Sequence, residues 1–294
     1  MVFKRFMAAL AAAVSFATFA QPPIPVTASF SILGDLVQMV GGNRVAVTAL
    51  VGSNEDAHVF EPKPAHAKAI LQSRLVITNG LGFEPWMDKL VKSAGYRGTR
   101  MTAATGVAPR NMEDGGRTIT DPHAWQDPTN VVFYVNNIRL ALEQLDPAGA
   151  ALYQANTRAY VAQLQALDTW ATAQFAAVPP NKRKVITSHD AFGYLAAHYQ
   201  LTFLAPQGMS TDGEASAKQV ASLIRQIQRE KIKAVFLENM ASPKLLEQLS
   251  KEAHVVPGDT LYADALSTNG QPGDTYLKMA RHNITALVAG LQKN

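Results

Sequence analysis

Residues 146–180 read DPAGAALYQANTRAYVAQLQALDTWATAQFAAVPP, with no β-strand pattern and no glycine after Gly149. Apolar side chains recur there at spacings of three, four and seven residues, the period of one helix face: Tyr153, Tyr160, Leu164, Leu167, Ala171 and Val178. Asp146-Pro147 is a suitable helix start, and Pro179-Pro180 ends the pattern because proline cannot continue a helix. The pattern predicts a helix over 146–178, about 48 Å long at ~1.5 Å per residue.

On both sides of this helix, short apolar runs rich in β-branched residues alternate with helical patterns, which predicts parallel sheets with helices on their faces. The expected strands are 26–30, 45–51, 75–80 and 99–103 before the helix, and 184–189, 201–206, 233–238 and 255–261 after it. The predicted fold class is therefore α/β, with two parallel-sheet lobes joined by a long helix.

The expected organisation is a signal peptide at 1–20, an N-terminal lobe at 21–145, a linker helix at 146–178 and a C-terminal lobe at 179–294. An alternative stays open, in which the long helix is an ordinary part of one domain. The connector is favoured because most helices are far shorter.

The first 20 residues have the layout of a secretory signal peptide. Lys4 and Arg5 precede the apolar run FMAALAAAVSFATF, and small residues lead to a cleavage site after about Ala20. The run is shorter than the ~20 residues of a membrane span. Because the sequence contains no cysteine, we expect no disulfide and no lipid anchor, and a free protein in the periplasm.

The composition is that of a soluble globular protein, with 47% hydrophobic and 17% charged residues. The formal net charge of +4 falls by two when Lys4 and Arg5 leave with the signal. No cluster of basic residues accompanies this small excess, so we expect no nucleic acid partner.

Two stretches echo each other, DAHVFEP at 56–62 and DPHAWQDP at 121–128. Each places an acid two residues before a histidine, His58 or His123, then an aromatic residue, then an acid followed by proline. His58 follows a predicted strand by a short loop, and His123 opens the loop before a helix that starts after Pro128. Functional groups concentrate in such loops.

Two more residues complete a candidate site. His189 ends one predicted strand and Asp264 lies just past another, and ligands of open α/β sheets bind at the carboxyl ends of strands. Three imidazoles and one carboxylate form a four-ligand set for a divalent transition metal. The remaining histidines lie in helical patterns, and we expect structural roles for them: His66, His198, His254 and His282.

The neighbours of the site histidines suggest supporting roles. A metal-bound histidine usually donates its other ring N–H to a carboxylate or carbonyl, which fixes its tautomer, although acidic residues also cap helices and make turns. Aromatic neighbours would wall the site against water. Six residues are candidates for orienting the ligands or walling the site: Asp56, Phe60, Glu61, Asp121, Trp125 and Asp190.

Four motifs in this order, AHVFEP, DPHAWQDP, SHDAFGYLAAHY and LYADALS, resemble the zinc- and manganese-binding proteins of bacterial ABC importers. The resemblance extends over nearly all of the chain after the signal. It implies two α/β lobes joined by a rigid backbone helix, with His58 and His123 from the first lobe and His189 and Asp264 from the second holding the metal. It also implies a protein that captures the ion and delivers it to a membrane permease, without a chemical reaction. We expect this protein to be a monomer.

Three departures from that family bear on the metal. Asp56-Ala57-His58 stands where the family often has Asp-Pro-His, so we expect a less rigid loop. Residues 97–120 contain no histidine, whereas many zinc-specific members carry a His-rich loop there. His189 stands where manganese-selective relatives often have a carboxylate. Three nitrogens and one oxygen favour Zn²⁺ over Mn²⁺ on ligand softness, and Mn²⁺ or another metal stays open.

A zinc-dependent hydrolase is the alternative from another class. A catalytic zinc keeps an open position for water beside three protein ligands, and Glu61 or Glu238 would be the general base. Four protein ligands leave little room for that water, so a binding protein is favoured over an enzyme.

Overall fold

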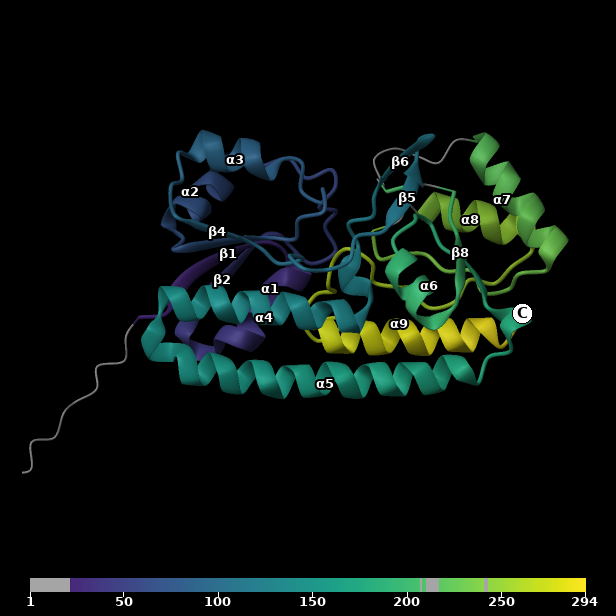
Figure 1. The fold of residues 1–294 in the computed structure, drawn as a ribbon. Helices are drawn as coiled ribbons and strands as arrows, with labels where there is room; N and C mark the ends of the chain where they lie inside the picture. The colour runs from purple at the N-terminus through teal and green to yellow at the C-terminus, as the bar shows by residue number, and fades with distance from the viewer. Residues whose placement is uncertain (1–21, 207, 210–216, 241–242) are drawn as a thin grey trace, which may run out of the picture.

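The computed structural model describes residues 22–206, 208–209, 217–240 and 243–294. Two α/β lobes lie side by side above a layer of long helices (Figure 1). The predicted signal peptide lies outside the described residues. In the part of the chain that is described, no helix is long and apolar enough to cross a membrane.

The first lobe is built on a parallel sheet of four strands, as the sequence predicted, and their order in the sheet is β2-β1-β3-β4. Strand β1 has a partner on each side, and nearly all of its residues are buried. Burial on both faces gives the continuous apolar run from which the strand was predicted. The strands are β1 (Ile24–Phe30), β2 (Val45–Val51), β3 (Leu75–Thr78) and β4 (Thr99–Thr102). The first helices are α1 (Ser31–Gly41), α2 (Pro64–Gln72), α3 (Met87–Ala94) and α4 (Pro128–Leu145).

A hairpin that the sequence analysis did not predict follows β4. Strands β5 (Asn111–Asp114) and β6 (Arg117–Thr120) pair antiparallel, and Gly115 and Gly116 take φ values of 56° and 78° between them. Tight hairpin turns need such positive φ values, which glycine adopts without strain. The hairpin lies against the second lobe (Figure 1), where the Met209 N–H donates to Asp114 Oδ1 at 3.3 Å.

The second lobe has a less regular sheet than predicted. β7 (Lys184–Ile186) and β8 (Thr202–Leu204) pair in parallel, and both are shorter than the predicted strands. The predicted strands 233–238 and 255–261 contribute only single parallel bridges, Ile186 to Val235 and Glu238 to Leu261. The helices of this lobe are α6 (Gly193–Tyr199), α7 (Ala217–Glu230), α8 (Pro243–Ala253) and α9 (Tyr276–Leu291).

The long helix α5 (Ala150–Ala176) has 27 residues and begins four residues after the predicted start. The residues before it form a 3₁₀ turn (Pro147–Gly149). The Asp146 carboxylate accepts hydrogen bonds from Arg44 Nε at 2.6 Å and Nη2 at 2.8 Å, and from the Tyr153 hydroxyl at 2.6 Å. These bonds fix the corner between α4 and α5, so the chain turns there before the helix starts.

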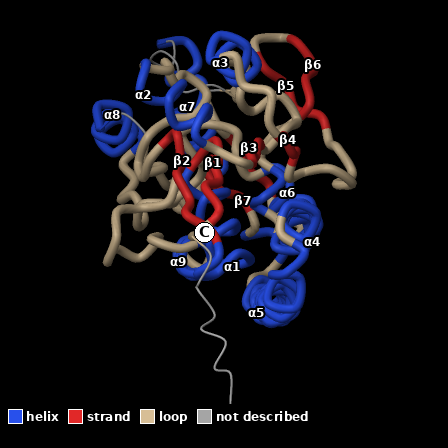
Figure 2. Tube along the Cα trace, turned by 90° about the vertical axis from the view of Figure 1, so that its left-hand side faces the viewer, coloured by secondary structure: helices blue, strands red, loops and turns tan. Residues whose placement is uncertain are grey.

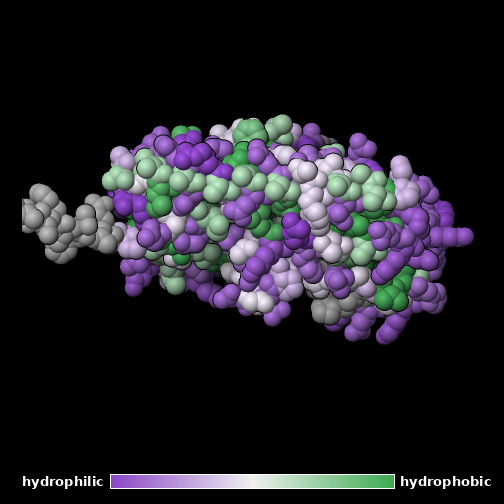
Figure 3. Space-filling view, turned by 90° about the horizontal axis from the view of Figure 1, so that it is seen from below, coloured by the Kyte–Doolittle hydropathy of each residue, from purple (hydrophilic) through white to green (hydrophobic). Residues whose placement is uncertain are grey.

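Helix α5 runs beside α4 along both lobes (Figures 1 and 2) and packs on α1 and α9. One hydrophobic core contains Phe30 and Trp125 from the first half of the chain together with Tyr276 and Leu287 from the second. The lobes are therefore packed together, and the domain boundaries at 146 and 178 stay a prediction. Seen from below, the surface mixes hydrophilic residues with small groups of hydrophobic ones (Figure 3).

Candidate metal centre

The structure brings together His58, His123, His189 and Asp264, whose ligand atoms all lie within 4.8 Å of one another. His123, His189 and Asp264 are fully buried, and His58 is 9% exposed. Each comes from a different segment: the loop after β2, the turn before α4, the loop after β7, and the chain just past Leu261. Such burial is costly for four polar side chains unless they share a partner.

The inner nitrogens of the three histidines converge on the carboxylate. Asp264 Oδ2 lies 3.0 Å from His189 Nε2 and 3.3 Å from His58 Nε2, and Oδ1 lies 3.7 Å from His123 Nε2. His58 Nε2 and His123 Nε2 are 3.3 Å apart. Ligands around a tetrahedral zinc, with bonds of about 2.0–2.1 Å, are separated by about 3.3 Å. The spacing of the four side chains therefore fits a single transition metal ion.

The two similar histidine motifs also have a similar local structure, in which an aspartate accepts the backbone N–H of the histidine two residues later. Asp56 Oδ1 accepts the backbone N–H of His58 at 2.7 Å, and Asp121 Oδ1 accepts that of His123 at 3.0 Å. Asp121 Oδ1 also lies 2.7 Å from His123 Nδ1. With its Nδ1–H donated to Asp121, His123 directs the lone pair of Nε2 at the other ligands. Burial raises the pKa of the Asp56 carboxyl despite the attraction of His58.

The carboxylate that faces the outer nitrogen of His189 is Glu238. Its Oε2 lies 3.7 Å from His189 Nδ1, and its Oε1 accepts the Ser188 backbone N–H at 3.2 Å. Asp190, the candidate from sequence proximity, donates its backbone N–H to the Gly208 carbonyl. Burial raises the pKa of the Asp190 carboxyl, and the charge of Asp121 adds to the effect. The signal for Glu238 was its place at the carboxyl end of the predicted strand 233–238.

The buried cluster is electrostatically coupled. Burial opposes the charge of Asp264, but the attraction of His189 and His123 holds the pKa of its carboxyl well below the usual range. Burial likewise opposes the charge of His189, yet Asp264 and Glu238 raise the pKa of its imidazole well above its usual value. A cation entering the site therefore competes with a proton on His189.

Aromatic rings wall the inner side of the cluster. Trp125 is fully buried with its ring 5.5 Å from that of His123, and Phe83, which sequence reasoning missed, packs edge-on to His58 at 4.8 Å. Phe60 packs instead on His66 and Trp86, with ring centroids at 4.8 Å in both cases. Glu61 is exposed to solvent.

The loop that carries Asp264 is held by residues of the first half of the chain. The carbonyl of Ala263 accepts hydrogen bonds from Trp125 Nε1 at 2.9 Å and Gln126 Nε2 at 2.7 Å. The Leu266 N–H donates to Ser31 Oγ at 3.0 Å. Asp264 is thus fixed at the junction of the two lobes, because first-lobe residues hold the residues on both sides of it in the chain.

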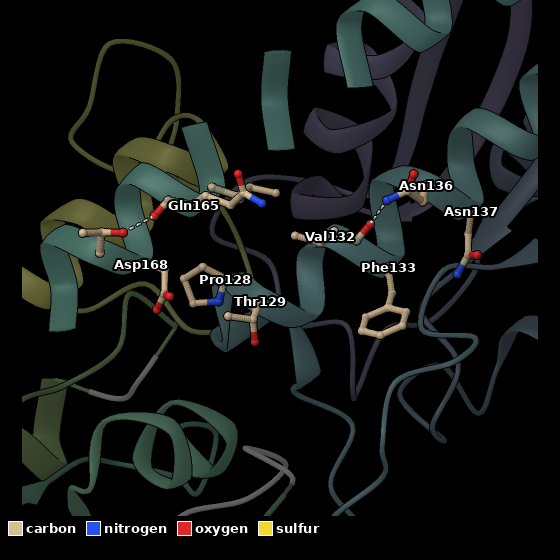
Figure 4. A pocket seen from close by; sticks show the side chains of 10 residues that line it. Pro128, Thr129, Val132, Phe133, Asn136, Asn137, Gln165 and Asp168 are labelled. Carbon is tan, nitrogen blue, oxygen red and sulfur yellow. Dashed lines mark hydrogen bonds between the residues drawn. The ribbon is translucent and has the colours of Figure 1, made fainter. Parts of the chain in front are cut away.

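Two histidines outside the cluster, His66 and His198, pair with other groups of the protein. His66 Nδ1 accepts the Lys63 N–H at the start of α2, and His198 Nε2 lies 2.8 Å from Asp168 Oδ1. A groove between α4 and α5, lined by Phe133, Asn137 and Asp168, lies outside the histidine cluster (Figure 4). Asn137 donates to the Ala103 carbonyl and Asp168 also accepts from the Tyr199 hydroxyl, so these groups are already satisfied within the protein.

Two α/β lobes bridged by a long helix, with buried imidazoles and a carboxylate at their junction, define a two-lobed metal-binding protein. The model of the family described as "Zinc-uptake complex component A periplasmic" (ZnuA) matches residues 26–290. The chain therefore belongs to this family.

Proteins that are named for different metals are similar to this chain in sequence or in fold. It is 30% identical to the "Manganese-binding lipoprotein MntA" of Halalkalibacterium halodurans, over 92% of this chain and 89% of that one. It is 30% identical to the "Iron-binding protein YfeA" of Yersinia pestis, over 90% and 85%. The structure of the periplasmic zinc-binding protein TroA of Treponema pallidum superposes with a TM-score of 0.85 at 26% identity, over 92% and 99% of the two chains.

Proposed function

We propose that the protein captures a divalent transition metal ion, zinc in the first place, in the periplasm and delivers it to the permease of an ABC importer. The observation that carries this proposal is the convergence of His58 Nε2, His123 Nε2, His189 Nε2 and the Asp264 carboxylate within 4.8 Å. The four side chains act as the ligands in this proposal. Family membership supports a transport component, since its members are solute-binding proteins of metal importers.

The ligand set supports binding over catalysis. Three neutral imidazoles and one carboxylate complete a four-coordinate zinc site, whereas a catalytic zinc needs an open position for water. Of the two general-base candidates for a hydrolase, Glu61 is exposed and Glu238 is held by Ser188 behind His189. The three histidines and Asp264 therefore suffice for a metal-binding role, whereas hydrolysis would need a general base that the site lacks among these two candidates.

Zinc is favoured because three of the four donors are imidazole nitrogens, which suit zinc better than manganese. Manganese is the second candidate. Asp264 Oδ1 is buried without a hydrogen bond, so the carboxylate can supply both oxygens and raise the number of donors to five. Oxygen donors and higher coordination suit manganese, and a relative of this chain is named as manganese-binding.

The remaining parts of the proposal concern location and partners. We propose a monomer that acts in the periplasm without a lipid anchor and without nucleic acid. The sequence contains no cysteine for lipid attachment, whereas MntA of Halalkalibacterium halodurans is named a lipoprotein. Cell fractionation tests this point, because an unanchored protein leaves the cell with the osmotic-shock fluid and an anchored one stays with the membranes.

Metal analysis of the untagged protein, purified without chelator, tests the function. After incubation with zinc and removal of excess metal, we expect one zinc per chain. The variants His123→Ala and Asp264→Ala should lose it. His282→Ala is the matched control, because His282 bonds the Thr260 carbonyl outside the cluster. A wild-type protein without stoichiometric metal after incubation with zinc or with manganese would contradict the proposal.

A further inference from the structure

Glu238 Oε2 and His189 Nδ1 face each other, and neither atom has a hydrogen bond partner. Their side chains are 1% and 0% exposed, and Glu238 Oε2 lies 3.7 Å from His189 Nδ1. Both atoms are buried without a hydrogen bond partner. Buried polar atoms are normally paired, and leaving one unpaired costs about 1–3 kcal/mol. The two atoms are within about 1 Å of a charge-assisted hydrogen bond, whose usual length is about 2.7–2.9 Å.

We infer that Glu238 is a positioning residue for the metal site: it accepts the Nδ1–H of His189 when the ion binds, and thereby fixes the ligating tautomer and strengthens zinc binding over manganese binding. This inference rests on the proposed function, because it assumes that His189 is a ligand.

The carboxylate of Glu238 is held in place from two sides. Its Oε1 accepts the N–H of Ser188, the residue before His189, and its backbone forms a parallel bridge with Leu261, three residues before Asp264. The same residue thus contacts the two second-lobe segments that carry ligands. A carboxylate anchored in this way can receive the histidine without moving itself.

Metal binding would close the gap between the two side chains. His189 Nε2 now lies 3.0 Å from Asp264 Oδ2. An ion bound by both atoms would separate them to about 3.3 Å, which would shift the imidazole ring away from Asp264. The Nδ1 side of the ring faces Glu238, and a metal on Nε2 makes the Nδ1–H a stronger donor. The His189 ring would therefore move toward the Glu238 carboxylate when its Nδ1–H becomes a stronger hydrogen-bond donor.

The first-lobe ligand His123 shows the completed arrangement. Asp121 Oδ1 lies 2.7 Å from its Nδ1, and this acid was visible in the sequence two residues before the histidine. For His189 the equivalent acid comes from another segment of the chain. A carboxylate on the outer nitrogen makes an imidazole a more basic ligand. Basic nitrogen donors benefit zinc more than manganese, which prefers oxygen.

The test uses Glu238→Gln, which keeps the shape of the side chain and removes its charge. An amide N–H facing Nδ1 would favour the tautomer with the proton on Nε2, which cannot ligate. Affinities for zinc and for manganese are measured by competition with a chromophoric chelator, and ¹⁵N NMR of the histidine rings reports the His189 tautomer. We expect zinc affinity to fall about 10–100-fold, manganese affinity to fall less, and the Nδ1–H signature of metal-bound His189 to be lost.

Asp146→Asn is the control, because it removes a buried carboxylate at the far end of α4 from the site, where Asp146 binds Arg44 and Tyr153. It should lower stability and leave zinc affinity unchanged. Thermal unfolding of each variant without metal separates folding from binding. Zinc affinity within twofold of wild type in Glu238→Gln, an unchanged His189 tautomer, or an equal loss of zinc affinity in Asp146→Asn would overturn the inference. Failure of the proposed function is a different result, in which the wild-type protein itself binds no metal.

Discussion

The substitution Asp35→Asn should stabilise the protein at neutral and alkaline pH. Asp35 lies on α1, and its Oδ2 accepts the backbone N–H of Tyr276 at the start of α9, 2.9 Å away. Burial raises the pKa of the Asp35 carboxyl from 3.8 to about 6, with repulsion from Asp274 adding to the effect. Its contribution to stability is therefore complete below pH 3.8 and is lost as pH rises through about 6.

The size of this effect follows from linkage. At about 1.36 kcal/mol per pKa unit, the raised pKa of Asp35 lowers the free energy of unfolding by about 3 kcal/mol at pH 8 and by about half of that at pH 5. Asparagine keeps the acceptor for Tyr276 and never ionises. The free energy of unfolding of Asp35→Asn, relative to wild type, should therefore increase by about 1.4 kcal/mol between pH 5 and pH 8.

Urea unfolding of both proteins at the two pH values measures this change, since ΔG is linear in denaturant. Asp88→Asn is the matched control: its carboxylate is 86% exposed on the surface, where it pairs with Arg100, and it should show no comparable dependence on pH. A difference between Asp35→Asn and wild type that is the same at pH 5 and pH 8 would refute the reasoning, because the cost of ionisation would then be absent.

Three further predictions concern metal binding. Asp264 and Glu238 raise the pKa of His189 well above its usual value against the opposing effect of burial, so the ion must displace a proton. Zinc affinity should therefore fall by up to about tenfold per pH unit on acidification from pH 8 to pH 6. Calorimetry in buffers of different ionisation enthalpy counts the protons released on zinc binding, and no release would contradict this prediction. Asp121→Asn should weaken zinc binding about 10–100-fold, because it replaces the charged acceptor of His123 Nδ1–H with a neutral amide oxygen. Chelator competition measures the affinity, and a value like that of wild type would contradict this prediction. Small-angle scattering should show little change in radius of gyration on adding zinc, since α5 and one shared core join the lobes; a large closure would exclude this rigid arrangement.

The sequence predicted the regular elements where local pattern and burial agree. In the first lobe, the central strands β1 and β3 are almost entirely buried. Burial on both faces gives the continuous apolar runs from which these strands were predicted. The hairpin at 111–120 was missed because its strands are mostly exposed and polar, although the Gly-Gly pair marks its turn. In the second lobe, apolar runs were longer than the strands, because buried segments there leave the sheet to form loops at the site.

The start of the long helix shows a different limit. Its period and its terminal prolines were readable, but the turn before it depends on Arg44, which is far from Asp146 in the sequence. The same holds for the surroundings of the site. Asp56 and Asp121 were found because they lie two residues from a histidine, whereas Phe83 and Glu238 reach theirs only through the fold.

The sequence by itself determined the α/β class, the periodicity of the connecting helix and the chemical types of the candidate ligands, because these depend on neighbouring residues and on side-chain chemistry. Only the tertiary structure decided that four side chains from separate loops meet within 4.8 Å, that a glutamate from another segment faces His189, and that first-lobe residues hold the Asp264 loop. These relations depend on how the two lobes pack together, and packing between distant segments leaves no regular spacing in the chain.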